Sequence, residues 1–206
     1  MGGMPTSRSY GDACSIARAL DVVGERWSLL VVRELLLGPQ RFSDLRRALP
    51  GASSNMLTDR LRELESHDVV ARSPAGYELT ESGRGLEPVV LALGGWGMRF
   101  PLPADAHLSA TSVLLFLRGS RDPGSRATYR IELGDRAWAV TAGDGPLHIE
   151  TGAPVHADAG LRTDPATLNA LLDGSVTLAA ARAAGTAALS GDEAALKRLL
   201  EPSASS

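Results

Sequence analysis

Small hydrogen-bonding side chains gather near the start of one predicted helix, over residues 53–67. Leu57, Leu61 and Leu64 recur at helical spacing, so they define the buried face of that helix. The opposite face then offers Asn55, Thr58, Asp59 and Arg62, and the N-terminal end adds Ser53 and Ser54; all but Asp59 are candidate contacts with DNA. Donors of this kind at a helix N-terminus suit hydrogen bonds to phosphates and to base edges in a major groove. The pattern predicts contact with double-stranded DNA.

Three more arginines flank this helix. Arg46 and Arg47 lie on the preceding predicted helix, where they either contact phosphates or form a solvated face. Arg72 lies on a predicted hairpin, from which it can reach an adjacent phosphate or the minor groove. The net charge of the chain is −3, so bulk positive charge cannot drive binding. Any contact with nucleic acid must therefore come from a local arrangement of arginines.

The sequence gives little support for disulfides, metal sites or catalysis. One cysteine, Cys14, excludes an intrachain disulfide and a cysteine-rich metal cluster. The four histidines have no close metal-ligand spacing: His67, His107, His148 and His156. Nucleophile elbows, phosphate-binding loops and zinc-protease motifs do not occur. We expect no enzyme activity, no cofactor and no metal.

The first half of the chain has helical periodicity almost throughout. Its predicted elements are helices at 14–23, 26–37, 42–49 and 53–67, strands at 69–73 and 77–79, and a last helix that follows Thr80 and extends to Trp96. Three helices, a hairpin and a closing helix make the winged variant of the helix-turn-helix. The helix at 53–67 is then the recognition helix.

The second half alternates between strand and helix signals. Strands are predicted at 129–133, 137–142, 147–151, 155–159 and 186–190, and helices at 165–172, 176–184 and 192–200. Glycines at 94, 95 and 97, followed by Pro101, mark a boundary between domains 1–100 and 101–206. The first domain holds 12 basic and 12 acidic residues, and the second 9 and 12. The acidic excess belongs to the second domain.

Over residues 13–97 the chain resembles the HxlR family of winged-helix transcription regulators. The matching residues are Cys14, 24–27 (GERW), 33–35 (REL), 41–47 (RFSDLRR), 57–65 (LTDRLRELE), 79–83 (LTESG) and 96–97 (WG). The resemblance implies a homodimer that binds near-palindromic operator DNA. It also implies a dimer interface built from the N-terminal helix and the last helix of the domain, through Leu86, Val90, Leu93 and Trp96.

Cys14 matches a cysteine through which some members of that family sense oxidants or electrophiles. A reactive cysteine needs surroundings that lower its pKa, and the neighbouring sequence supplies none beyond arginines. We therefore expect a buried thiol that packs a helix in the dimer, with a redox switch as the alternative.

The second half resembles the sterol-carrier-protein type of lipid-binding domain. The matching residues are 157–158 (AD), 163–164 (TD), 171–174 (LLDG), Gly185, 190–192 (SGD) and Leu196. The resemblance implies a mixed sheet and helices around an apolar cavity that holds a hydrophobic small molecule. The side chains expected to line this cavity are Tyr129, Trp138, Leu117, Leu168, Leu171 and Leu178.

Together these patterns predict an α+β protein with a winged-helix domain followed by a sterol-carrier-like domain. The expected function is a homodimeric repressor of transcription whose operator binding responds to a hydrophobic effector. Two alternatives stay open: a regulator switched through Cys14, and a lipid or polyketide carrier whose N-terminal domain only dimerises. No apolar stretch approaches the roughly 20 residues of a membrane span, so we expect a cytoplasmic protein with no membrane partner.

Overall fold

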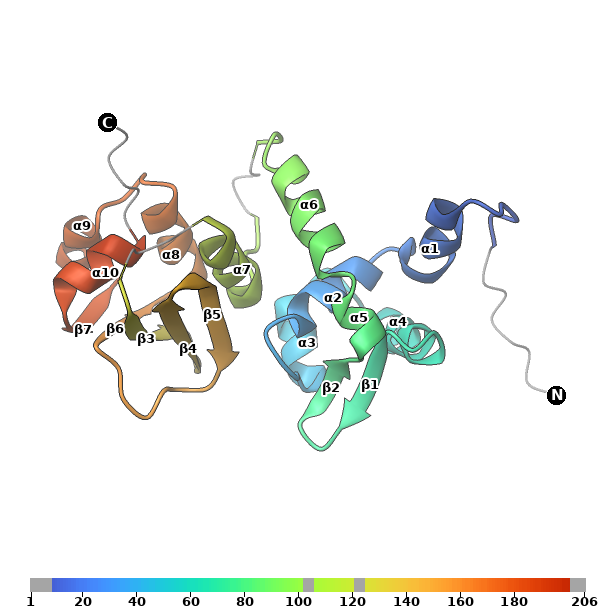
Figure 1. Cartoon of the computed structure of the whole chain (residues 1–206), viewed down its shortest axis with the longest axis horizontal. Helices are drawn as coiled ribbons and strands as arrows, with labels where there is room; N and C mark the ends of the chain where they lie inside the picture. The colour runs from blue at the N-terminus through green and yellow to red at the C-terminus, as the bar shows by residue number, and fades with distance from the viewer. Residues whose placement is uncertain (1–8, 102–105, 121–124, 201–206) are drawn as a thin grey trace. The chain divides into compact units, whose positions relative to one another are not determined.

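The computed structural model describes residues 9–101, 106–120 and 125–200. The chain forms two compact units, Met1–Pro103 and Ala104–Ser206 (Figure 1). Both α-helices and β-strands occur in each unit, as the predicted α+β class requires. Among the described residues, no helix has the length and hydrophobicity needed to cross a membrane.

The first unit is a winged helix-turn-helix, which confirms the prediction (Figure 1). Its elements are α1 (Ser15–Val23), α2 (Ser28–Leu35), α3 (Phe42–Ala48), α4 (Ser54–Ser66), β1 (Val70–Ser73), β2 (Gly76–Leu79), α5 (Glu81–Arg84) and α6 (Glu87–Gly97). Val31 and Val32 of α2 and Leu57 and Leu64 of α4 are fully buried. This apolar core fixes which face of α4 is left for solvent.

Hydroxyl side chains cap the N-termini of α4 and α5. The Ser53 Oγ accepts a hydrogen bond of 3.3 Å from the Met56 N–H at the start of α4. The Thr80 Oγ1 accepts one of 3.0 Å from the Gly83 N–H at the start of α5. Because free N–H groups at a helix start need acceptors, these two residues define where the helices begin.

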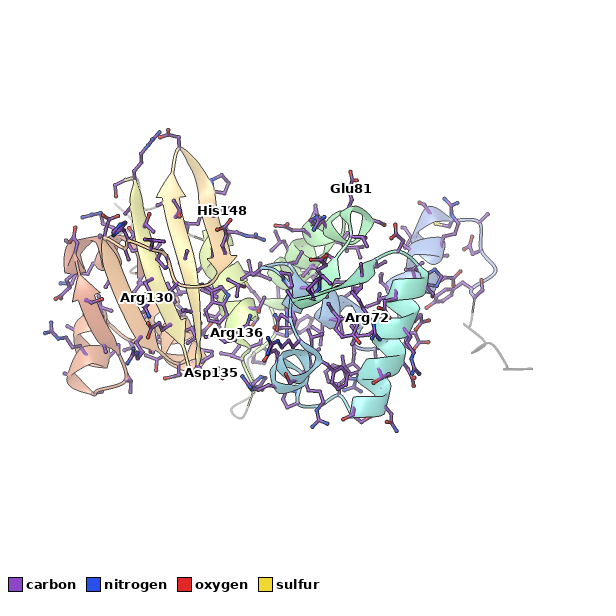
Figure 2. All side chains as sticks on the ribbon, turned by 90° about the horizontal axis from the view of Figure 1, so that it is seen from below. Arg72, Glu81, Arg130, Asp135, Arg136 and His148 are labelled. Atoms are coloured by element: carbon purple, nitrogen blue, oxygen red, sulfur yellow. The ribbon has the colours of Figure 1, made fainter. Side chains whose placement is uncertain are left out.

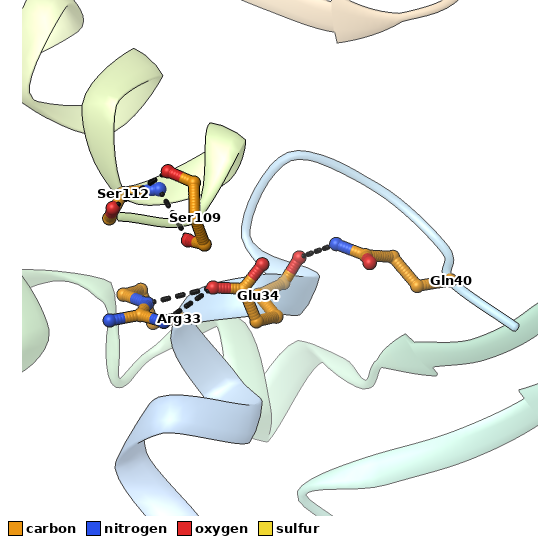
Figure 3. A network of polar contacts seen from close by, with 5 residues as sticks. All are labelled: Arg33, Glu34, Gln40, Ser109 and Ser112. Carbon is orange, nitrogen blue, oxygen red and sulfur yellow. Dashed lines mark hydrogen bonds and ion pairs between the residues drawn. The ribbon is translucent and has the colours of Figure 1, made fainter. Parts of the chain in front are cut away.

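The wing is held against the end of α2. Gln40 and Tyr77 form an isolated antiparallel bridge, with N–H to carbonyl distances of 2.9 and 2.8 Å. Gly76 has a φ of +131°, and a Cβ there would lie 2.3 Å from the Gln40 carbonyl oxygen, so only glycine fits. Figure 3 shows that the Gln40 side-chain amide donates to the Glu34 carbonyl oxygen, while Arg33 and Glu34 form an ion pair at 2.6 Å.

Two predicted helices of this unit have different bounds. The helix expected from Thr80 to Trp96 is broken between Arg84 and Glu87, since a proline follows at the start of α6. The helix expected at 26–37 is the shorter α2, because Trp27 has a φ of +80° and Gly38 one of +121°. Left-handed conformations at both ends stop the helical hydrogen bonding.

The second unit contains a five-stranded mixed sheet of order β5-β4-β3-β6-β7. Its elements are α7 (Ala110–Ser120), β3 (Ala127–Leu133), β4 (Arg136–Gly143), β5 (Gly145–Thr151), β6 (Ala159–Thr163), α8 (Pro165–Leu172), α9 (Leu178–Ala183), β7 (Ala188–Gly191) and α10 (Glu193–Leu200). The β3–β6 pair is parallel and the other pairs are antiparallel.

The helices of this unit lie on one face of its sheet (Figure 1). Along β3, Tyr129 and Ile131 are buried, whereas Arg130 and Glu132 between them face the other side. Figure 2 shows the sheet from this other side, with Arg130 on the strands in front. Within this unit, one face of the sheet is therefore the core and the opposite face is open.

In the second half, one predicted strand was wrong in its bounds and one helix was missed. The strand expected at 155–159 is β6 at Ala159–Thr163, and Val155 is 93% exposed. The strand begins later than expected, because pairing with β3 starts only at the Tyr129–Ala159 register. Helix α7 was not predicted; the Ser109 Oγ accepts a hydrogen bond of 3.1 Å from the Ser112 N–H at its start (Figure 3).

Candidate nucleic-acid interface

Helix α4 presents a polar stripe on the side away from the core. Asn55, Asp59 and Arg62 recur at i, i+4 and i+7, and all three are exposed. The Arg62 guanidinium lies 3.9 Å from the Asp59 carboxylate, with both side chains about two-thirds exposed (71% and 67%). These three side chains are exposed along one face of the helix, where a ligand could reach them.

The N-terminal end of α4 adds hydroxyl groups, some of which already have partners. Ser53 accepts the capping hydrogen bond, so its own hydroxyl hydrogen is still available for donation. Thr58 is half-buried, and its hydroxyl donates to the Ser54 carbonyl oxygen at 2.8 Å. The Arg46 guanidinium contacts the Ser54 hydroxyl, which joins the end of α3 to the start of α4. The structure thus brings Arg46 next to Ser54, one of the two predicted serines.

Arg47 and Arg72 lie beside acidic residues. The exposed Arg47 guanidinium is 3.9 Å from Asp44. On the wing, the Arg72 Nε lies 2.9 Å from a Glu65 carboxylate oxygen, and its guanidinium stacks 5.1 Å from the centre of the Tyr77 ring (Figure 2). The hydrogen bond to Glu65 raises the pKa of Arg72 above its ordinary value. Arg72 is thereby held in place at the C-terminal part of α4.

The polar face extends along most of α4. Glu65 follows Ser54 by eleven residues, which corresponds to about 16 Å along a helix axis. The Asp59 carboxylate lies here, as the helical spacing predicted. Met56, 43% exposed, and the Glu65 carboxylate lie at the edges of this face and were not predicted. The helical spacing from Asn55 identifies Asp59, whereas the Glu65–Arg72 pair depends on how the wing folds back.

A second candidate surface is apolar and lies on α6. Val89, Leu93 and Trp96 recur at i, i+4 and i+7 and are 46%, 47% and 55% exposed. Of the four predicted interface residues, Leu86 and Val90 pack against the core of their own unit, while Leu93 and Trp96 face away from it. On α1, Ile16 is 69% exposed. We call the exposed residues Val89, Leu93 and Trp96 the α6 stripe.

Cys14 is exposed and forms the N-cap position of α1. Its backbone N–H donates to the Asp12 carboxylate at 2.9 Å. Within one chain the thiol therefore lies open to solvent, and its burial would need a partner chain.

The six side chains expected to line an apolar cavity are all fully buried. They are Leu117, Tyr129, Trp138, Leu168, Leu171 and Leu178, each 0% exposed. A cavity large enough for water would leave accessible area on its walls, so these side chains fill the core instead. The Tyr129 hydroxyl donates to the Ala195 carbonyl at 3.4 Å, and burial raises the pKa of Tyr129.

The histidines do not form a metal site in the part of the chain that the structure describes. The His148 Nε2 lies 2.8 Å from a carboxylate oxygen of Glu150 on its own strand, and both side chains are exposed. No cluster of three or more potential ligands occurs among the described residues.

Residues 22–104 match the sequence model of the HxlR-like helix-turn-helix family. The HTH-type transcriptional regulator YdeP of Bacillus subtilis is 34% identical, over 48% of this chain and 82% of YdeP. The HTH-type transcriptional regulator sll1512 of Synechocystis is 40% identical, over 40% of this chain and 67% of sll1512. The crystal structure of quinone-bound YodB from B. subtilis has 35% identity, covers 41% of this chain and 97% of YodB, and has a TM-score of 0.39. The family match spans α2 to α6, which include α4 and the wing.

Proposed function

Because the chain belongs to the HxlR-like helix-turn-helix family of transcriptional regulators, we propose that it binds operator DNA as a homodimer and represses transcription. The observation that carries this proposal is the exposed polar stripe of α4, with Asn55 and Arg62 opposite a fully apolar buried face. An amide and a guanidinium are the groups that recognise adenine and guanine in a major groove.

In the proposed complex, the α4 helices of two protomers enter successive major grooves about 34 Å apart. Ser53, Ser54, Asn55, Thr58 and Arg62 contact bases and nearby phosphates, and Arg46, Arg47 and Arg72 contact the backbone. The α6 stripe and α1 form the interface between protomers, so the operator is near-palindromic.

The experiment that tests this function is a gel-shift assay with the DNA upstream of the protein's own gene. The proposal expects a retarded complex that survives excess unrelated DNA. A lipid or polyketide carrier that uses its N-terminal unit only to dimerise would give no such complex. Alanine at Ser54, Asn55, Thr58 and Arg62 would then change nothing, which would overturn the proposal.

Glu65→Gln is expected to strengthen binding to DNA of any sequence about two- to fivefold. The substitution removes a negative charge from the proposed phosphate-facing side and weakens the contact that holds the Arg72 guanidinium, whose Nε lies 2.9 Å from Glu65. Fluorescence anisotropy with a labelled duplex at 100 mM salt measures the change. Glu81→Gln, an exposed change at α5, is the control and should leave affinity unaltered. Equal affinity of Glu65→Gln and the unmodified protein would show that Arg72 does not contact phosphates.

The second unit is proposed to bind a hydrophobic effector between its sheet and its helices. The mixed sheet with helices on one face supports this, and so does one buried polar atom. The Trp138 indole N–H is buried and has no hydrogen-bond acceptor among the described residues. An unpaired buried donor costs about 1–3 kcal/mol, which a ligand with an oxygen acceptor would recover. Since the core is closed, the helices must move from the sheet to admit the ligand.

Trp138→Phe is therefore expected to weaken effector binding about tenfold while the protein stays folded. The smaller phenyl ring keeps an apolar aromatic side chain in the core, but the donor is lost. A panel of fatty acids and sterols can be screened by the shift in thermal unfolding and then added to the gel-shift assay. A tenfold change in operator affinity requires only about 1.4 kcal/mol of coupling. If no compound shifts either unfolding or operator binding, the effector proposal fails.

A redox switch at Cys14 is the second candidate, and the exposure of its thiol at the N-terminus of α1 favours it. Oxidation of the thiol beside a dimer interface would alter the spacing of the two recognition helices. Cys14→Ser should then bind the operator as well as the unmodified protein does but lose any response to peroxide or quinone. A response that persists in Cys14→Ser would exclude this switch, since no other cysteine exists in the chain.

A further inference from the structure

The open face of the sheet in the second unit carries a hollow of about 270 Å³. Strands β3, β6 and β7 form it, on the side opposite the buried aromatic residues. The side chains at this hollow are Arg130, Glu132, Arg162, Ala188 and Ser190, with Gly160 between them. It is separate from the proposed effector core, which lies on the other face.

The strand register places these residues in two adjacent rows. Arg130, Gly160 and Ser190 lie opposite one another across β3, β6 and β7. In the next row, Glu132 lies opposite Arg162, which lies opposite Ala188. The two arginines are therefore diagonal neighbours on one face, with small residues around them. Both arginines line the hollow together with Gly160 and Ser190.

Glu132 binds both arginines and leaves the group with a net positive charge. The Arg130 Nε lies 2.6 Å from Glu132 Oε1, and the Arg162 Nε lies 2.5 Å from Oε2. The hydrogen bond from Arg162 lowers the pKa of Glu132, so this carboxylate stays ionised near neutral pH. Two guanidinium groups against one carboxylate leave one positive charge. Each arginine approaches Glu132 most closely through its Nε, and a guanidinium carries four further N–H donors on its terminal nitrogens.

Gly160 lines the hollow and leaves room for the Ser190 side chain. A Cβ at this position would lie 2.5 Å from the Ser190 Oγ, so the serine hydroxyl occupies the space that a side chain would take. Glycine inside a regular central strand weakens the sheet and often marks a place where a ligand approaches the backbone. The pairing of β6 with both neighbours is regular, so no bulge accounts for this glycine.

We propose that this hollow binds a small organic anion, through a carboxylate or phosphate group held between Arg130 and Arg162. The arginine forks match planar and tetrahedral oxyanions, and the Ser190 hydroxyl supplies a further donor. The volume lies just below the range of pockets for drug-sized ligands, which restricts the ligand to a few heavy atoms beyond its anionic group. This site goes beyond DNA binding and does not depend on it.

The test uses the full-length protein without DNA. Inorganic phosphate and, separately, acetate are titrated into the ¹⁵N-labelled protein at constant ionic strength set with chloride. The Nε–Hε signals of Arg130 and Arg162 report on the site. We expect saturable shifts with a dissociation constant in the millimolar range for at least one of the two anions. Which anion saturates first distinguishes a phosphate ligand from a carboxylate.

Arg162→Gln is expected to weaken the binding about tenfold, and Ser190→Ala about two- to threefold. The control is Arg126→Gln, which removes an exposed, ion-paired arginine of the same unit that lies outside the hollow. It should leave the titration unchanged. Linear, non-saturating shifts in the unmodified protein would overturn the proposal. So would equal affinity in Arg162→Gln, or an equal loss in Arg126→Gln.

Discussion

Leu93→Glu should convert the proposed dimer into monomers and weaken operator binding about 100-fold. Leu93 is the centre of the α6 stripe and is 47% exposed in the single chain, so the substitution costs the folded protomer little. In the dimer, the two-fold symmetry would bring two new carboxylates into an apolar contact. A monomer retains only one recognition helix, and the loss of bivalency accounts for the drop in affinity. Light scattering coupled to gel filtration and anisotropy with operator DNA measure the two effects.

Leu91→Glu is the matched control for this prediction. Leu91 lies on the same helix and is 40% exposed, but at about 100° per residue it falls on the side opposite the α6 stripe. This variant should remain dimeric and bind the operator normally. If both variants dissociate equally, or if Leu93→Glu stays dimeric, the stripe is not the interface.

The double substitution Asn55→Ala and Arg62→Ala should reduce the preference for operator over unrelated DNA about 1,000-fold. Each well-formed contact with a base is worth about 1–3 kcal/mol, and a dimer makes each contact twice. Both side chains are exposed and outside the apolar core, so the fold should be maintained. Competition gel shifts with operator and unrelated duplexes measure the preference, and circular dichroism checks the fold.

Arg182→Ala serves as the comparison, because it removes an exposed arginine from α9 in the second unit. Its specificity should equal that of the unmodified protein. A double variant that loses affinity for both duplexes equally would assign Asn55 and Arg62 to backbone contacts. A variant with unchanged affinity would remove α4 from the proposed interface.

The first unit was predictable because its signals are local. Ser53 and Thr80 cap their helices where the sequence indicated, and Leu57, Leu61 and Leu64 are buried as their spacing required. Capping and amphipathic periodicity act within a few residues, so the local sequence is enough to predict where a helix begins and which face is buried. The break between α5 and α6 was missed, although Pro88 marks it.

The contacts of the candidate interface were predictable only in part. The exposure of Asn55 and Arg62 follows from the helical pattern, and the structure confirms that exposure. The pairing of Arg72 with Glu65 and its stacking on Tyr77 do not follow from it. Those contacts depend on how the wing folds against α4. Packing between two separate elements produces no periodic pattern in the sequence, so it could not be predicted.

In the second unit, the contrast between what the sequence predicts and what the tertiary structure decides is stronger. The sequence alone determined a mixed arrangement of strands and helices, with Tyr129 and Trp138 on apolar strand faces. Only the tertiary structure decided that these rings are fully enclosed by the core. It also decided that Arg130 and Arg162 meet at Glu132, through the parallel pairing of β3 with β6. Residues some thirty positions apart become neighbours only when a sheet register forms, because that register is set by long-range packing rather than by local preference.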